Sequence, residues 1–249
     1  IYGDYRCEAL FGEVLRQKPA LRQQMQLITK CGIKLISSQR PEHRIKYYDT
    51  GREHIISSVE QSLRNFHTDY IDVLLIHRPD ALMDADEVAA TFTELRRQGK
   101  VLHFGVSNFT PAQFDLLQSR LDFPLVTNQI EFSVLAMSPA YDGTLDHLQQ
   151  NRVLPMAWSP LGGGGLFHGQ DERVQRVRSV LQQVGEELGG APIDQVALAW
   201  IMTHPARILP VLGTGKIERI RSAAQASQLR LSREQWYMVW QASAGHEVP

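Results

Sequence analysis

The fold is decided by one stretch of the sequence, residues 71–80, which reads IDVLLIHRPD. Its apolar run can lie buried along a β-strand as far as Ile76, where a titratable imidazole, that of His77, ends the run. Other short apolar segments predict five more strands, which are LIT at 27–29, HFGVS at 103–107, LVTNQI at 125–130, VLPMAW at 153–158 and ILPVLG at 208–213.

Segments of helical period separate these strands. Apolar residues recur at helical spacing in two of the segments, at Ile55, Ile56, Val59, Leu63 and Phe66, and at Val88, Phe92 and Leu95. Thr110 and Pro111 supply the N-cap and the first-turn proline of another helix. Later helices are predicted at about 172–188, 192–203, 217–227 and 232–243. Such alternation indicates parallel strands joined by crossover helices.

Two architectures fit this alternation, an open doubly wound sheet and a closed (β/α)8 barrel. Functional side chains gather at the C-terminal ends of many strands in a barrel, but at one switch point in an open sheet. Nearly every predicted strand ends in residues that can bind a ligand or take part in chemistry. These residues are Thr29 and Lys30, His77, Ser107 and Asn108, Asn128 and Gln129, Trp158 and Ser159, and Gly213, Thr214 and Gly215. The sequence therefore predicts an α/β protein of the (β/α)8 TIM barrel type. Because a barrel needs eight strands, we expect two βα units to precede Ile1 and residues 1–249 to belong to a single barrel domain.

Composition and charge argue against several classes of protein. Hydrophobic residues make up 43% and charged residues 21% of the 249, which is typical of a globular protein. The net charge of -1 argues against a nucleic-acid or membrane-surface partner. Cys7 and Cys31 cannot build a disulfide framework, and no apolar run approaches the ~20 residues of a membrane helix. We therefore expect a cytoplasmic protein with a small-molecule partner.

Two strand ends carry residues suited to acid–base chemistry, Lys30 and His77. Taken alone, Lys30 could be a solvated cap and His77 an ordinary satisfied histidine. Because parallel strands end at one rim of a barrel, the two side chains are expected to meet there. An ammonium can lower the pKa of a tyrosine, such as Tyr2, so that the tyrosine donates a proton to a carbonyl. A neutral imidazole can hydrogen-bond the same oxygen, and this chemistry requires no metal.

Seven short motifs run along the chain in an order that points to one enzyme family. They are IYG at 1–3, TKCG at 29–32, LLIHRPD at 74–80, GKVLHFGVSNF at 99–109, TNQIEFS at 127–133, AWSPLGGG at 157–164 and GTGKIERI at 213–220. As a set the motifs resemble the aldo-keto reductases, in particular bacterial NADPH-dependent oxidoreductases. The resemblance implies a (β/α)8 barrel that binds NADPH without a Rossmann domain and transfers hydride to an aldehyde or ketone.

The resemblance also implies roles for single residues. Tyr2 matches the family's proton donor, Lys30 the partner that lowers the pKa of this tyrosine, and His77 the imidazole that orients the carbonyl. This role of His77 explains why an imidazole ends the apolar strand. The family's catalytic aspartate, five residues before the tyrosine, would lie before Ile1.

The matching cofactor residues fall into four groups. Ser107, Asn108 and Gln129 match the residues that hold the nicotinamide carboxamide. Trp158 falls where the family stacks an aromatic ring, more often tyrosine, on the nicotinamide. The loop over the pyrophosphate begins with Ser159, Leu161 and Gly162. The adenosine 2'-phosphate would be held at a helix N-terminus by Gly213, Thr214, Gly215, Lys216 and Arg219.

Three functions are compatible with parts of this pattern. The sequence predicts an NADPH-dependent aldo-keto reductase acting on small or aromatic carbonyl compounds, although Ala223 stands where the family often has an asparagine near the adenine. A second interpretation is a nicotinamide-binding regulatory or redox-sensing subunit with little turnover. A third, a metal-dependent hydrolase built around His77, lacks a partner histidine or carboxylate at neighbouring strand ends.

Overall fold

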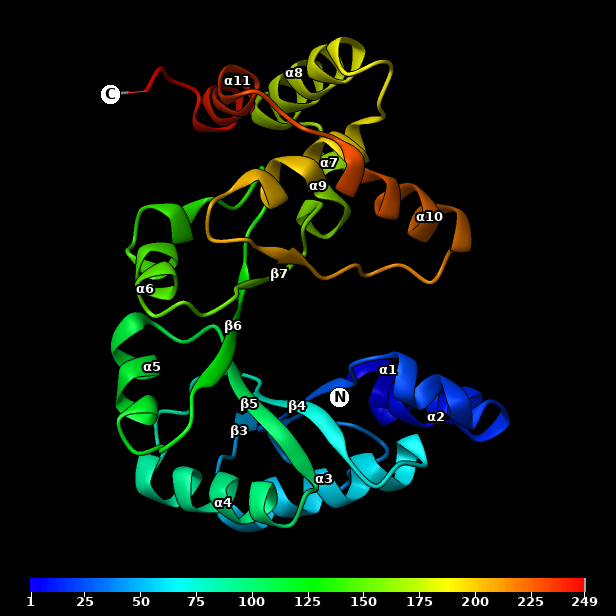
Figure 1. Ribbon diagram of the computed structural model, residues 1–249, viewed down its shortest axis with the longest axis vertical. Coiled ribbons are helices and arrows are strands. Elements are labelled where there is room, and N and C mark those ends of the chain that lie inside the picture. Colours follow the sequence, from blue (N-terminus) through cyan, green and yellow to red (C-terminus); the bar gives the residue numbers. More distant parts are fainter. Residues whose placement is uncertain (249) are drawn as a thin grey trace. The chain divides into compact units, whose positions relative to one another are not determined.

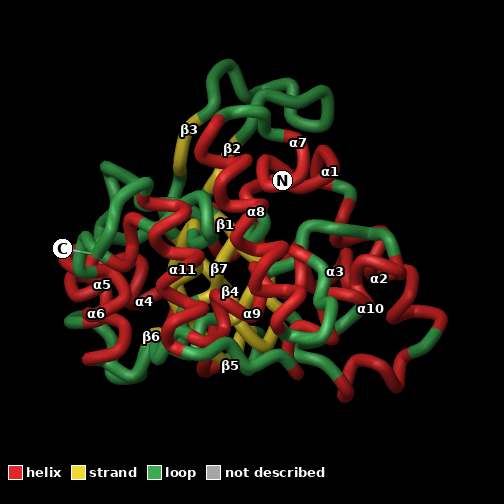
Figure 2. The backbone as a smooth tube through the Cα atoms, turned by 90° about the horizontal axis from the view of Figure 1, so that it is seen from above, coloured by secondary structure: helices red, strands yellow, loops and turns green. Residues whose placement is uncertain are grey.

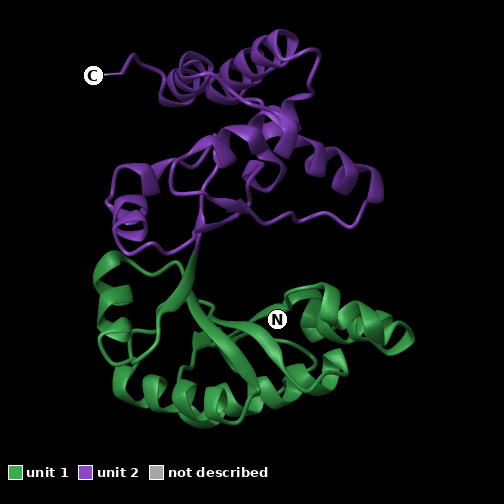
Figure 3. Ribbon diagram, viewed as in Figure 1, with its two compact units in different colours: residues 1–128 green, residues 129–249 purple. Residues whose placement is uncertain are grey.

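The computed structural model describes residues 1–248, and the chain divides into two compact units (Figure 3). Unit 1 comprises Ile1–Asn128, and unit 2 begins at Gln129. Each unit contains parallel β-strands that alternate along the chain with α-helices, as the sequence predicts. Within residues 1–248, no helix is both long and apolar enough to cross a membrane.

The sheet of unit 1 contains three complete parallel strands, β1 (Ile28–Cys31), β4 (Ile71–Ile76) and β5 (Val101–Ser107), and the beginning of β6 (Leu125–Glu131). β4 lies between β1 and β5, with Val73 opposite Ile28 of β1 and His103 of β5. A central strand is covered on both faces, so its side chains from Leu74 to Ile76 are almost fully buried. These strands confirm the predicted segments at 27–29, 71–77 and 103–107.

The principal helices of unit 1 are α2 (Cys7–Gln17), α3 (Arg52–Phe66), α4 (Ala85–Arg97) and α5 (Pro111–Gln118) (Figure 1). α3 buries four of the side chains that its helical period predicts, Ile55, Val59, Leu63 and Phe66. α4 begins after Asp84, whose carboxylate accepts hydrogen bonds from two backbone amides of the first turn. α5 begins with a capping box formed by Thr110 and Gln113. Local capping therefore fixes where α4 and α5 begin.

Several elements near the start of unit 1 were not predicted, including α2. The others are α1 (Tyr2–Tyr5), the 3-10 helix η1 (Pro19–Gln24), and an antiparallel hairpin of β2 (Ile33–Lys34) and β3 (Tyr47–Tyr48) (Figure 2). α2 packs closely on α3 at Gly12, where a Cβ atom would lie 1.8 Å from the backbone oxygen of Asn65. Only glycine permits this approach of the two helices.

The strands of unit 2 are also parallel. β6 (Leu125–Glu131), which begins in unit 1, pairs with β7 (Met156–Trp158), and β7 pairs with β8 (Leu209–Pro210). β8 is shorter than the predicted strand at 208–213. Pro210 has no amide hydrogen to donate, and one further bond, from the amide of Val211 to the carbonyl of Ala157, extends the pairing. The residues after Val211 are therefore a loop.

The helices of unit 2 confirm four predicted ones. These four are α8 (Glu172–Glu187), α9 (Ile193–Thr203), α10 (Ile217–Gln225) and α11 (Arg233–Ala244). The others are the short helices α6 (Thr144–Gln150) and α7 (Gly165–His168) and the 3-10 turns η2 (Ser138–Ala140), η3 (Gly162–Gly164) and η4 (Ala226–Gln228). These elements were not predicted because they are too short for a helical period to stand out.

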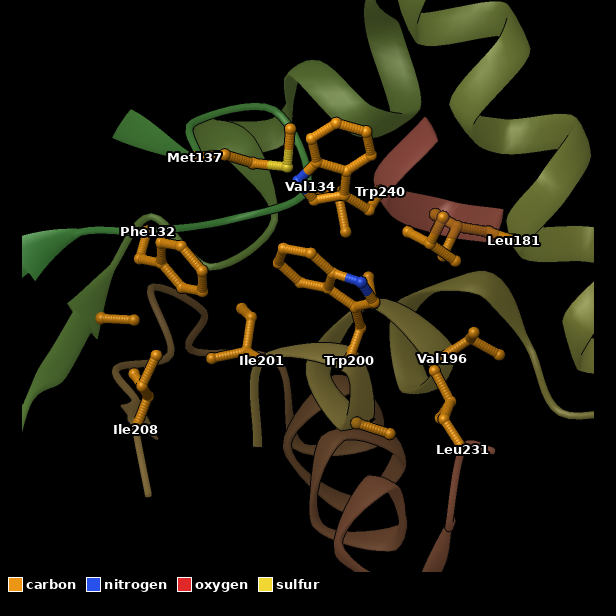
Figure 4. Close-up of a cluster of buried hydrophobic side chains, with 14 of the residues drawn as sticks. Phe132, Val134, Met137, Leu181, Val196, Trp200, Ile201, Ile208, Leu231 and Trp240 are labelled. Atoms are coloured by element: carbon orange, nitrogen blue, oxygen red, sulfur yellow. The ribbon is translucent and has the colours of Figure 1, made fainter. Parts of the chain in front are cut away.

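Unit 2 has its own hydrophobic core around Trp200 of α9 (Figure 4). The Trp200 ring stacks on Phe132 at a centroid distance of 5.4 Å and on Trp236 of α11 at 4.8 Å. Each of the two indole N–H groups donates a hydrogen bond to the backbone carbonyl of the other tryptophan. Large aromatic rings bury much apolar area while their polar edges stay satisfied. This core fixes α9 and α11 relative to the segment that follows β6.

Candidate functional site

The three predicted catalytic side chains meet in unit 1. The hydroxyl oxygen of Tyr2 lies 3.2 Å from Nε2 of His77, and the centroids of the two rings are 5.6 Å apart. Nζ of Lys30 lies over the Tyr2 ring, 5.1 Å from its centroid. All three residues line one cavity of about 720 Å³ within unit 1. A concave site with converging polar groups is where a small molecule binds in most enzymes.

Strand register places Lys30 beside His77. β1 and β4 run parallel with Lys30 opposite Leu75 and Cys31 opposite Ile76, so the two strands end at the same edge. The backbone amide of His77 donates a hydrogen bond of 2.9 Å to the carbonyl of Cys31, which carries the pairing one residue beyond β4. His77 therefore follows the buried strand at the point where the chain reaches the cavity.

The surroundings of His77 keep its imidazole neutral. Burial, followed by the positive charge of Lys30, lowers the pKa of His77 to about 3, and the nearby cations Arg78 and Lys46 add to the effect. Burial also lowers the pKa of Lys30 to about 8. A neutral imidazole carries one ring hydrogen, which it can donate to an oxygen atom. His77 is thus suited to orienting an acceptor at neutral pH.

The pKa of Tyr2 corrects an expectation drawn from the sequence. The resemblance implies that Lys30 lowers this pKa, whereas burial raises the pKa of the Tyr2 hydroxyl, and the charge of Arg78 opposes the rise. The physical reason is that a phenolate would lose water in the cavity, while the ammonium of Lys30 faces the ring. Tyr2 therefore keeps its proton at neutral pH.

Two of the predicted carboxamide-binding residues follow each other at the end of β5. Ser107 is almost fully buried, and Asn108 has a positive φ of 60°. Asparagine tolerates this left-handed region better than most residues. The side-chain nitrogen of Asn108 donates a hydrogen bond of 2.7 Å to the Ser107 hydroxyl. Gln129, the third residue, lies in unit 2 near the end of β6 and is also buried.

A tight turn follows β7 in unit 2 and contains the residues predicted for the pyrophosphate loop. Trp158 ends β7, and Ser159 has a positive φ of 50°. The amide of Gly162 donates a hydrogen bond of 2.8 Å to the carbonyl of Ser159. Gly162 has a φ of 63°, and a Cβ atom there would lie 2.9 Å from Cδ1 of Leu135, so this position favours glycine. Leu161 packs against the core of unit 2.

The segment predicted to bind a phosphate follows β8 and leads into α10. Cβ atoms built on Gly213 and Gly215 would have no other atom within 4 Å, so the backbone is open to a ligand. Lys216 is the N-cap residue of α10, and its amide donates a hydrogen bond to the Thr214 hydroxyl. Lys216 and Arg219 are both exposed. A helix N-terminus with two exposed cations suits an anion.

Glu8 of α2 is a residue of the cavity that the sequence analysis missed. Its carboxylate accepts hydrogen bonds from the Thr29 hydroxyl at 2.6 Å, the Ser62 hydroxyl at 2.8 Å and the Asn65 amide at 2.9 Å. Glu8 thus ties α2 both to β1, beside Lys30, and to α3. The sequence does carry a signal for Glu8, because Glu8 is at helical spacing from Gly12 and Leu15, the buried residues of α2, and so lies on the same face of the helix.

Two other features of the cavity bear on its chemistry. Cys31 is fully enclosed, and burial raises the pKa of its thiol to about 12. A thiol with so high a pKa is a small buried side chain and a poor nucleophile. Among residues 1–248, no three histidine, cysteine, aspartate or glutamate side chains are gathered as metal ligands.

Known proteins similar to this chain point to one family. The model of the aldo/keto reductase family matches residues 1–244. Oxidoreductase YdhF of Escherichia coli (strain K12) is 55% identical over 249 residues, which are 100% of this chain and 82% of that protein. The 6-dehydroglucose reductase of Agrobacterium fabrum is 47% identical over 248 residues, 100% of this chain and 82% of that protein.

A solved structure gives the same indication. The thermostable aldo-keto reductase Tm1743, crystallised with the inhibitor epalrestat, matches with a TM-score of 0.82 at 26% sequence identity. The match covers 97% of this chain and 79% of that one.

Proposed function

This chain belongs to the aldo-keto reductase family and is an NAD(P)H-dependent oxidoreductase with that family's (β/α)8 barrel fold; from this premise we propose that it uses NADPH to reduce aldehydes or ketones to alcohols, with Tyr2 as proton donor. One observation carries the proposal, the distance of 3.2 Å between the Tyr2 hydroxyl and Nε2 of His77. Two groups so close can both reach a single carbonyl oxygen.

The protonation states of the trio fit this reaction. Tyr2 holds its proton because burial raises its pKa, and His77 is neutral because burial and Lys30 lower its pKa to about 3. Bound NADPH would supply the hydride to the carbonyl carbon. As the oxygen gains negative charge, His77 donates a hydrogen bond to it and Tyr2 transfers its proton. The ammonium of Lys30 then stabilises the phenolate left on Tyr2.

The residues proposed to hold NADPH suit its separate parts. Ser107 and Gln129 are buried and Asn108 is partly buried, and their polar side chains offer hydrogen bonds to a carboxamide. Trp158 offers a ring for stacking, and the turn of Ser159, Leu161 and Gly162 offers backbone amides to a pyrophosphate. The open backbone of Gly213, Thr214 and Gly215, with Lys216 and Arg219, suits the extra phosphate that distinguishes NADPH from NADH.

A sugar-derived aldehyde is the first substrate to test. The Agrobacterium fabrum protein that is 47% identical to this chain is named a 6-dehydroglucose reductase. In this chain the cavity around Tyr2 is also lined by Gln39, Arg40 and His43, whose side chains can hydrogen-bond hydroxyl groups. We therefore propose small hydroxylated carbonyl compounds, 6-dehydroglucose among them, as the leading substrate class, with simple aromatic aldehydes as comparison.

The proton donor is tested by Tyr2→Phe in the complete protein. Losing a general acid lowers turnover by at least ~100-fold, while NADPH affinity should stay nearly unchanged. Tyr48→Phe is the matched control, because the Tyr48 hydroxyl makes no hydrogen bond within residues 1–248 and Tyr48 does not line the cavity. Aldehyde reduction by Tyr2→Phe at a nearly normal rate would refute Tyr2 as the donor. A wild-type protein that binds NADPH but reduces none of the carbonyl compounds would favour a regulatory subunit.

The cofactor preference is tested by fluorescence titration with NADPH and NADH. Charge-assisted contacts contribute roughly 1.5 to 3 kcal/mol each, so Arg219→Ala should weaken NADPH binding by about 10- to 100-fold and leave NADH binding unchanged. Arg221→Ala is the matched control, since Arg221 is exposed on the same helix but two residues away, on a different face. Equal affinities for both cofactors in the wild type would refute the preference.

A further inference from the structure

The three residues that follow Tyr2 all adopt left-handed backbone conformations. The φ angles are 58° at Gly3, 55° at Asp4 and 63° at Tyr5. Glycine adopts this region readily and aspartate tolerates it better than most residues, but for Tyr5 the conformation is unfavourable, and L-residues rarely adopt it in succession. Such a left-handed turn persists only when its surroundings hold it.

The segment after β2 supplies contacts that hold this turn. The Ser37 hydroxyl donates a hydrogen bond of 2.5 Å to the carboxylate of Asp4, and the amide of Leu35 donates one of 3.0 Å to the Tyr5 hydroxyl. The guanidinium of Arg40 lies over the Tyr5 ring at 4.8 Å. All three contacts join residues 3–5 to one stretch of chain, residues 35–40.

That stretch is itself a turn with a defined shape. The amide of Arg40 donates a hydrogen bond of 3.0 Å to the carbonyl of Ser37, and the amide of Gln39 donates one of 3.0 Å to the Ser37 hydroxyl. The Ser37 hydroxyl therefore accepts from its own turn and donates to Asp4. This arrangement fixes the direction of its hydrogen toward the Asp4 carboxylate.

The position of Tyr2 depends on this backbone. The amide of Tyr5 donates a hydrogen bond to the carbonyl of Ile1, so the left-handed turn closes around Tyr2. Tyr2 as a whole residue is 57% exposed, so the cavity encloses it only in part and side-chain packing alone holds it loosely. Its distance of 3.2 Å from His77 leaves little tolerance, because a displacement of about 1 Å can cost about 100-fold in rate.

We propose that residues 35–40 hold the left-handed turn of Gly3, Asp4 and Tyr5 and thereby keep the Tyr2 hydroxyl against His77, with Asp4 and Ser37 as positioning residues. This inference rests on the proposed function of Tyr2 as proton donor. Neither Asp4 nor Ser37 needs to touch the substrate, since both act through the backbone that carries Tyr2. A change in either should therefore affect turnover more than the binding of cofactor or substrate.

A double-mutant cycle in the complete protein tests the proposal. Asp4→Ala and Ser37→Ala should each lower kcat by about tenfold, which is about 1.4 kcal/mol, with KM and NADPH affinity changed less than threefold. Combining the two should cost little more than either alone, because both remove the same contact. Asp4→Asn keeps an acceptor and tolerates positive φ, so it should restore most of kcat. Ser38→Ala is the matched control, since Ser38 is exposed and makes no hydrogen bond within residues 1–248.

A measurement independent of turnover separates this inference from the proposed function. In protein labelled with ¹³C at the tyrosine ζ carbon, the Tyr2 signal is assigned by its loss in Tyr2→Phe. Asp4→Ala and Ser37→Ala should shift or broaden this signal, and Ser38→Ala should not. An unshifted Tyr2 signal together with normal kcat in both variants would overturn the positioning role, even if Tyr2→Phe is inactive. A shifted signal in a protein in which Tyr2→Phe keeps full activity would instead support the turn and refute Tyr2 as donor.

Discussion

Replacing Gly12 by alanine should destabilise the protein strongly, although the same change stabilises most helices. Gly12 lies in α2, where alanine ordinarily gains about 1 kcal/mol over glycine. Here the added Cβ would lie 1.8 Å from the backbone oxygen of Asn65 and 3.0 Å from the Cα of Phe66, both in α3. Backbone atoms cannot rotate away as a flexible side chain could. The two helices must therefore separate.

The size of the effect follows from the separation needed. Restoring ordinary contact with the Asn65 oxygen requires a movement of about 1.6 Å, and overpacking of this kind costs typically about 1–3 kcal/mol. The same movement would stretch the hydrogen bonds from Ser62 and Asn65 to Glu8, now 2.8 and 2.9 Å, beyond bonding distance. Bonds to a charged group contribute about 1.5–3 kcal/mol each. After the helix-propensity gain and partial relaxation, we expect a net loss of about 3–5 kcal/mol.

Urea unfolding followed by circular dichroism measures this loss. With an m value of about 3 kcal/mol/M, the midpoint should fall by about 1–2 M. Leu10→Ala is the control, because Leu10 is 69% exposed on the same helix and should change the stability by less than about 0.5 kcal/mol. Combining Gly12→Ala with Glu8→Ala should cost less than the sum of the two, since both disrupt the same contacts. An unchanged or higher midpoint for Gly12→Ala would refute the reasoning.

Two further predictions concern the stability of the protein in acid and the ion pair between Arg22 and Asp72 in unit 1. Because the folded pKa of His77 is lowered to about 3 from an unfolded value of ~6.5, the unfolded chain binds the extra proton first. The free energy of unfolding should therefore fall as pH drops from about 6.5 toward 3, by at most about 5 kcal/mol. In unfolding curves measured over this pH range, the His77→Gln variant should lose less of this free energy than the wild type. Arg22→Met should cost about 3–5 kcal/mol in the same assay, because Arg22 pairs with Asp72 at 2.6 Å in a largely buried setting. Arg16→Ala, which breaks an exposed pair, should leave the midpoint unchanged.

The strands could be predicted because each carries its own signal. β4 is covered on both faces, so its apolar run from Val73 to Ile76 is continuous and ends where His77 reaches the cavity. Parallel strands end at one edge of a sheet, so the order of the elements along the chain was enough to predict that Lys30 and His77 lie close together. The cofactor residues were likewise assigned from local motifs at strand ends, and their binding roles remain predictions.

Features that depend on distant contacts could not be predicted. The left-handed turn after Tyr2 is held by Ser37, and Glu8 acts through Ser62 and Asn65, more than 50 positions away. No periodicity in a single segment encodes such contacts. The pKa of Tyr2 was assigned the wrong direction for a related reason, because burial in a cavity depends on how several segments pack.

Geometry, more than acid strength, selects the proton donor. At neutral pH both Tyr2 and Lys30 carry a proton, and Lys30, with its pKa lowered to about 8, is the stronger acid of the two. The Tyr2 hydroxyl, however, lies within hydrogen-bonding distance of His77, whereas Nζ of Lys30 lies over the tyrosine ring. A carbonyl oxygen oriented by His77 would therefore meet the hydroxyl first. If Lys30 could donate a proton directly to the carbonyl oxygen, the Tyr2→Phe variant would keep substantial turnover. Near-complete loss of turnover in this variant would show instead that Lys30 acts by stabilising the phenolate of Tyr2.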